Sequence, residues 1–101
     1  MSLAGSGSGT KQLTASGEVG IAGRPIRIFS FSVLSGGTAG TSTLKSNGSS
    51  GTTLFTYTCA VVSTDNIFNF GSAGMLFPQG CYWTKDSNST DAKFNYVQEV
   101  V

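Results

Sequence analysis

The chain has 101 residues, which suits a single domain, and it has a net charge of +1 with charged residues making up only 11% of the sequence. Its six lysines and arginines are scattered rather than clustered, which argues against a surface dedicated to nucleic acid. No apolar run approaches the about 18 residues of a transmembrane helix, so we expect no membrane partner either. A surface this poor in charge fits a protein that packs against neighbours.

Residues 1–16 form a Gly/Ser-rich segment, in which Leu3 and Leu13 are the only apolar side chains besides Met1 and two alanines. This composition predicts a flexible N-terminal arm, followed by a single β-sandwich domain over residues 17–101. Because such an arm becomes ordered only against a surface, Leu3 and Leu13 are candidate contacts with a neighbouring subunit.

The first strand is predicted at residues 26–34 (IRIFSFSVL), where apolar and polar side chains alternate. Phe29, Phe31 and Val33 fall on one face of this segment, and two serines fall on the other. A period of two is typical of a half-buried strand, so we expect these three side chains to point into the core.

Shorter strands follow, separated by turns rich in Gly, Asn and Ser. They are expected at residues 41–45, 53–61, 67–70, 75–77, 80–85 and 92–98. Their expected core side chains are Phe55, Tyr57, Phe68, Phe70, Phe94 and Tyr96. The sequence has no helical stripe longer than two turns, and Asn47-Gly48 supplies a hairpin turn. The pattern predicts an all-β fold, an antiparallel Greek-key or jelly-roll-like sandwich of about seven or eight short strands, with a small barrel as the alternative.

The two cysteines, Cys59 and Cys81, lie 22 positions apart inside apolar segments. This spacing matches no zinc or redox motif. We expect two buried, reduced thiols, and a cross-strand disulfide is the alternative.

Residues that carry chemistry are scarce. The chain has no histidine, so we expect no Ser–His or Cys–His dyad, no enzyme activity, no metal centre and no cofactor. Asp86 and Asp91 share one polar turn and could bind calcium, but hydrogen bonds to the turn backbone are the more common role of such residues. The Gly-rich residues 35–40 lack the lysine and the following helix of a phosphate loop, which predicts a plain turn.

Adjacent aromatic residues and an apolar C-terminus supply the other candidate contacts. Tyr82 and Trp83 could form a platform for a sugar, although packing in a core or interface is the more common role. Val100 and Val101 are the last two residues, and exposure of their apolar side chains to water is unfavourable. The candidate interface residues are therefore Leu3, Leu13, Tyr82, Trp83, Val100 and Val101.

Three stretches, residues 16–28 (SGEVGIAGRPIRI), 36–41 (GGTAGT) and 69–82 (NFGSAGMLFPQGCY), together resemble small β-sandwich virion proteins of tailed bacteriophages, particularly capsid decoration (cement) proteins. The resemblance covers residues 16–98. It implies a structural protein on the capsid surface, assembled in the host cytoplasm, that binds the major capsid protein and forms a homotrimer. It implies no catalytic residues. The alternative is a carbohydrate- or host-surface-binding module of a head fibre or tail.

Overall fold

The computed structural model describes residues 7–36, 40–59, 65–87 and 89–98 of the chain. These residues form nine strands. They are β1 (Gly7–Leu13), β2 (Gly17–Glu18), β3 (Ile26–Ser35), β4 (Gly40–Ser46), β5 (Thr52–Cys59), β6 (Asp65–Asn69), β7 (Met75–Phe77), β8 (Tyr82–Thr84) and β9 (Ser89–Gln98). Among the described residues, no helix is long and apolar enough to cross a membrane.

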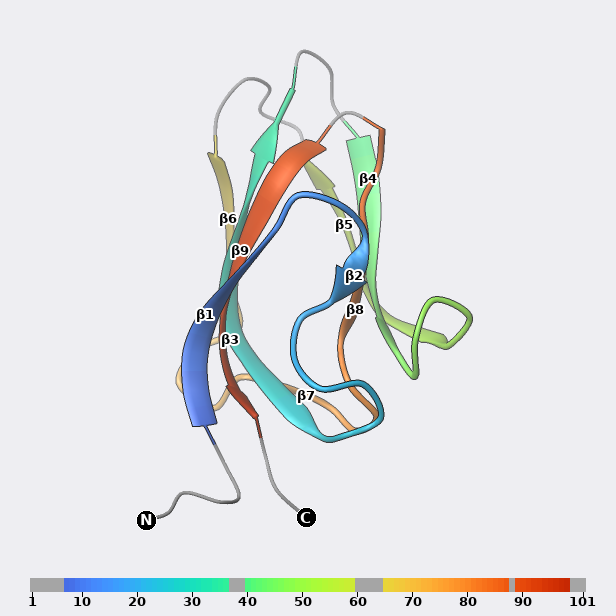
Figure 1. The fold of residues 1–101 in the computed structure, drawn as a ribbon. Helices are drawn as coiled ribbons and strands as arrows, with labels where there is room; N and C mark the ends of the chain where they lie inside the picture. The colour runs from blue at the N-terminus through green and yellow to red at the C-terminus, as the bar shows by residue number, and fades with distance from the viewer. Residues whose placement is uncertain (1–6, 37–39, 60–64, 88, 99–101) are drawn as a thin grey trace.

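The strands form two antiparallel sheets that face each other (Figure 1). The first sheet has the order β1-β9-β3-β6, with β7 also paired to β3, and the second has the order β2-β8-β4-β5. With the short β7 set aside, the other eight strands have the order of a jelly roll, in which two Greek keys are wrapped into a sandwich. The predicted all-β jelly-roll-like sandwich is therefore confirmed.

The N-terminal segment differs from the prediction. Instead of a flexible arm over residues 1–16, residues Gly7–Leu13 form β1, the edge strand of the first sheet, and pair with β9 from Gly7↔Gln98 to Leu13↔Ala92. Backbone hydrogen bonds to β9 order this segment, although its sequence lacks alternating apolar side chains. β1 is thus part of the sandwich, and the domain begins before residue 17. Leu3 lies outside the described residues.

The core lies between the two sheets. Its buried apolar residues are Val19, Ile26, Ile28, Phe31, Val33, Leu44, Tyr57, Cys59, Phe77, Cys81, Trp83, Ala92 and Phe94. Of the predicted core residues, Phe55, Phe68, Phe70 and Tyr96 are half-buried and pack against this cluster. Phe31 is central, because its ring centroid lies 4.9 to 6.2 Å from those of five other aromatic residues.

Phe29 was predicted in the core, and this prediction is wrong. On β9, Tyr96 pairs with Ile28 and Asn95 pairs with Ser30, so Phe29 is the extra residue of a β-bulge. The bulge shifts the alternation of β3 by one position. Ile28 is inward before it, Phe31 is inward after it, and Phe29 is only half-buried.

Candidate functional site

A hydrogen-bonded network is buried at one end of the sandwich. The indole Nε1 of Trp83 on β8 donates to the hydroxyl of Tyr57 on β5 at 2.6 Å. That hydroxyl also bonds Ser42 on β4, whose Oγ accepts the backbone N–H of Asp86 at 3.1 Å. A Cβ at Gly40 would collide with the Asp86 carboxylate, so a larger residue there would displace this side chain. The network joins β4, β5, β8 and the turn that precedes β9.

Burial keeps two groups here protonated at neutral pH, the Tyr57 hydroxyl of the network and the neighbouring Cys59 thiol. Burial raises the pKa of Tyr57 to about 12, although hydrogen bonds with Trp83 and Ser42 oppose the shift. Burial also raises the pKa of the Cys59 thiol, and the nearby Asp86 carboxylate adds to this effect. A protonated thiol is a poor nucleophile. The arrangement therefore stabilises the strands and offers no activated group for covalent chemistry.

The two cysteines are both buried and free, as predicted. Cys59 pairs with Gly40 at one end of β4, whereas Cys81 precedes Tyr82, which pairs with Lys45 near the other end. Five residues of β4 separate these positions by roughly 17 Å, so the alternative of a cross-strand disulfide within one chain is wrong. Burial, together with the charge of Glu18, raises the pKa of the Cys81 thiol well above its ordinary value.

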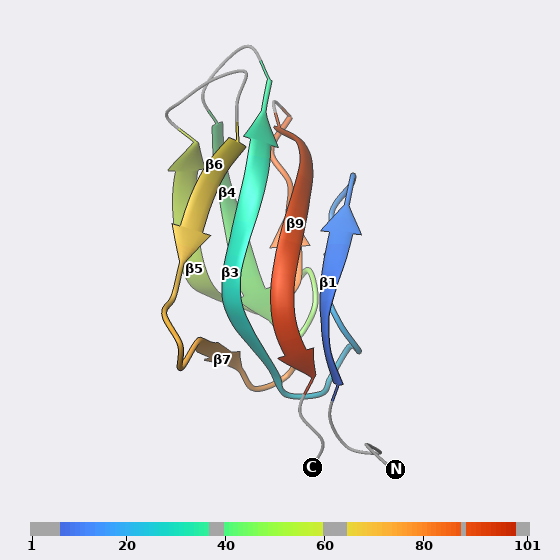
Figure 2. The ribbon, with the colours of Figure 1, turned by 90° about the vertical axis from the view of Figure 1, so that its left-hand side faces the viewer.

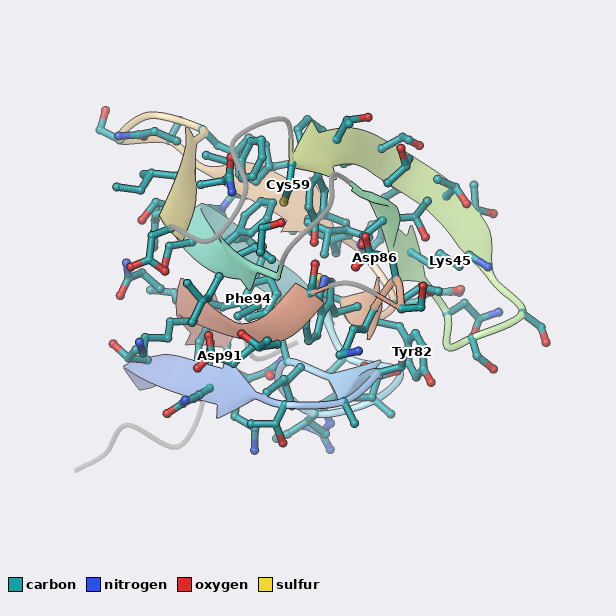
Figure 3. All side chains as sticks on the ribbon, turned by 90° about the horizontal axis from the view of Figure 1, so that it is seen from above. Lys45, Cys59, Tyr82, Asp86, Asp91 and Phe94 are labelled. Carbon is teal, nitrogen blue, oxygen red and sulfur yellow. The ribbon has the colours of Figure 1, made fainter. Side chains whose placement is uncertain are left out.

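The carboxylates of Asp86 and Asp91 do not share a site. Asp86 lies toward β4, and its Oδ1 accepts the backbone N–H of Ser89 at 2.8 Å, which confirms the predicted turn hydrogen bond (Figure 3). Asp91 lies between β9 and β1, where its Oδ2 accepts a hydrogen bond from Gln12 Nε2 at 2.9 Å. Across the described part of the chain, no three His, Cys, Asp or Glu side chains are grouped to hold a metal ion.

The candidate interface residues lie in different environments. Leu13 is half-buried and packs against the core, while Tyr82 is half-buried on the outer face of the second sheet. Trp83 is fully buried, so it offers no surface to a neighbouring subunit, and no Tyr82–Trp83 platform for a sugar exists. The reason is that adjacent residues of a strand point to opposite faces. Val100 and Val101 lie outside the described residues.

One side of the sandwich, which we call the open side, consists of β5, β6 and β7 (Figure 2). It carries three of the exposed large apolar residues, with 75% of Ile67, 40% of Leu76 and 36% of Leu54 accessible to solvent. Asp65 is the only charged residue in these three strands. Ile67 and Leu54 point outward from opposite sheets, because Phe68 and Phe55 beside them point inward.

Between the two edge strands of the open side lie the half-buried rings of Phe55, Phe68 and Phe70. The Phe55 centroid is 5.0 Å from that of Phe70 and 6.4 Å from that of Phe68, both in edge-to-face geometry. We did not identify this side from the sequence. A signal was present, however, because placing Phe68 and Phe70 inward leaves Ile67 on the outer face.

Comparison with known proteins gives a likeness of fold. No family model matches the sequence, and no curated protein matches it. A solved chain from the work described as "Bacillus endospore appendages form a novel family of disulfide-linked pili" superposes with a TM-score of 0.50. The match covers 95% of this chain and 88% of that chain, at 13% sequence identity. At this level of identity the likeness concerns the fold alone, and it agrees with a small all-β domain.

Proposed function

We propose that this chain is a structural protein of an assembled particle, and specifically a capsid decoration protein of a tailed bacteriophage that binds neighbouring capsid subunits. The observation that carries the proposal is the open side, where Ile67, Leu76 and Leu54 expose apolar side chains on three strands whose only charged residue is Asp65. Apolar side chains exposed on these strands would gain from burial against another protein, so we propose a protein partner on this side.

Two further points support a structural role. The sequence stretches described above resemble virion proteins, and the fold is similar to that of a chain from appendage pili. Both comparisons concern proteins of assembled structures. We propose no enzymatic role for this chain, because the buried thiols and the Tyr57 hydroxyl stay protonated at neutral pH.

The proposed assembly is non-covalent. The appendage pili of the structural neighbour are described as disulfide-linked. In this chain Cys59 and Cys81 are both 0% exposed, so neither sulfur reaches a neighbouring subunit without local unfolding. We therefore propose attachment through packing and backbone hydrogen bonds, with the major capsid protein and further copies of this chain as partners.

The test is the composition of purified particles. Virus particles from the source of this sequence should contain the chain in a fixed ratio to the major capsid protein, and a reducing agent should not release it. Particles lacking the chain should recover it at full occupancy when the purified protein is added. Absence of the chain from purified particles, or its release by reductant alone, would contradict the proposal.

A further inference from the structure

Among the described strands, β5 has the least protected free edge. β5 pairs with β4 along one side, from Gly40↔Cys59 to Ser46↔Thr52, and no described strand pairs with its other side. Its eight residues, TTLFTYTC, include neither a charged residue nor a proline. Natural proteins usually protect exposed edges with such residues, because an open edge hydrogen-bonds readily to another chain.

The other three edges of the sandwich carry protection. β2 has only two residues, and β1 includes Lys11 and two glycines. β6 has five residues and begins with Asp65. Of the edge strands that the structure describes, only β5 combines length with a lack of charge, which favours the inference that this edge is covered in the assembled protein.

The composition of β5 favours a second copy of the same strand as its partner. Two identical edges meet without electrostatic repulsion only when they carry no net charge, and β5 carries none. An antiparallel pair of identical strands is related by a two-fold axis, so one surface is complementary to itself. The half-buried ring of Phe55 lies at this edge, and pairing would remove more of it from water.

We propose that the free edge of β5 pairs antiparallel with the β5 edge of a second copy of this chain, so that the second sheets of two copies join into one continuous sheet. This inference rests on the proposed structural role, in which contact between subunits is the task of the chain. It makes a two-fold pair the first unit of assembly, in place of the trimer that the resemblance implies.

The test compares two threonines that face each other across β4 and β5. Thr41 and Thr58 are both exposed, and their Oγ1 atoms lie 2.9 Å apart. Thr58→Lys and Thr41→Lys each break this hydrogen bond and add one charge to the same sheet face, but only Thr58 lies on the edge strand. Sedimentation velocity over a concentration series of the full chain measures self-association, and far-UV circular dichroism confirms that each variant is folded.

We expect the wild-type chain to dimerise, Thr58→Lys to weaken the dimer about tenfold or more, and Thr41→Lys to leave it within about twofold. As a second measurement, Thr56→Cys near the middle of β5 should give an oxidised dimer on a denaturing gel, whereas Thr41→Cys should not. Equal weakening by both lysine variants, or a wild-type trimer, would overturn the pairing. A wild-type monomer that still co-purifies with particles would overturn it too, while leaving the proposed function intact.

Discussion

Replacing Phe31 with alanine should remove the aromatic centre of the core, whereas the same change at Phe29 should be mild. Phe31 is 1% exposed and contacts the rings of five other aromatic residues. Phe29 is half-buried at the bulge, where it opposes no residue of β9. The two residues share a side-chain type and a strand, so each serves as the control for the other.

The magnitude follows from burial. Truncation of a fully buried phenylalanine costs about 3–5 kcal/mol, because the lost transfer free energy adds to the cost of the cavity. Truncation of a half-buried ring removes less apolar surface from the fold and should cost about 1 kcal/mol. We therefore expect the free energy of unfolding to differ by at least about 2 kcal/mol between the two variants.

Urea unfolding is the suitable assay, since Trp83 is the single tryptophan and lies fully buried in the core. With a urea m-value of about 2 kcal/mol per molar, Phe31→Ala should lower the midpoint by about 2 M and Phe29→Ala by about 0.5 M. If Phe31→Ala does not fold, Phe31→Leu should still cost about 1 kcal/mol or more. Equal losses at the two positions would refute the bulge and the register of β3 against β9.

Other buried groups give three further predictions. Tyr57→Phe should lower the free energy of unfolding by about 1–3 kcal/mol, because the Trp83 N–H would lose its acceptor inside the core, and the urea midpoint measures this loss. Burial raises the pKa of Glu18 above its ordinary value of 4.5, so the folded state binds this proton more tightly than the unfolded state does. Stability should therefore fall as pH rises from 4.5 through the folded pKa, and Glu18→Gln should remove this fall from the pH profile of the thermal midpoint. The thiols of Cys59 and Cys81 are buried and protonated, so a thiol reagent should label the native chain only at the rate of its opening or unfolding.

A specific result would contradict each of these three predictions. Tyr82→Phe is the matched control for Tyr57→Phe, because Tyr82 is half-buried on the outer face of the second sheet, and equal losses would contradict the role of the buried hydrogen bond. Parallel pH profiles for wild type and Glu18→Gln would show that Glu18 is not desolvated in the fold. Immediate labelling of both thiols in the native chain would contradict their burial.

Most strands could be located from the sequence. The alternation in residues 26–34, 53–61 and 92–98 corresponds to β3, β5 and β9, with residues 60–61 outside the described residues, because each of these strands has one face in the core and the other in water. β1 could not be located in this way, since its sequence, GSGTKQL, has no apolar face and its strand conformation comes from pairing with β9. The alternation of apolar and polar side chains indicates which face of a strand is buried. An edge strand that is held mainly by backbone hydrogen bonds need not show this alternation.

The sequence was a poorer guide to which residues and strand edges are exposed on the surface. Alternation places Tyr82 and Trp83 on opposite faces, but only the packing of the two sheets against each other, with the Trp83 ring beside Phe94 of β9, shows that Trp83 is the buried one. The exposure of β5 depends on the order of strands in the second sheet, which is set by contacts between segments far apart in the chain.

The residue pattern by itself determined the all-β class, most of the strands and the burial of both cysteines, because these depend on short-range alternation and on apolar side chains avoiding water. Only the tertiary structure decided the bulge at Phe29, the incorporation of β1 and the free edge of β5. Those features depend on which strands are neighbours in a sheet. Neighbouring strands are joined by hydrogen bonds between backbone groups, and because these groups are the same at nearly every residue, the sequence pattern does not show which strands pair.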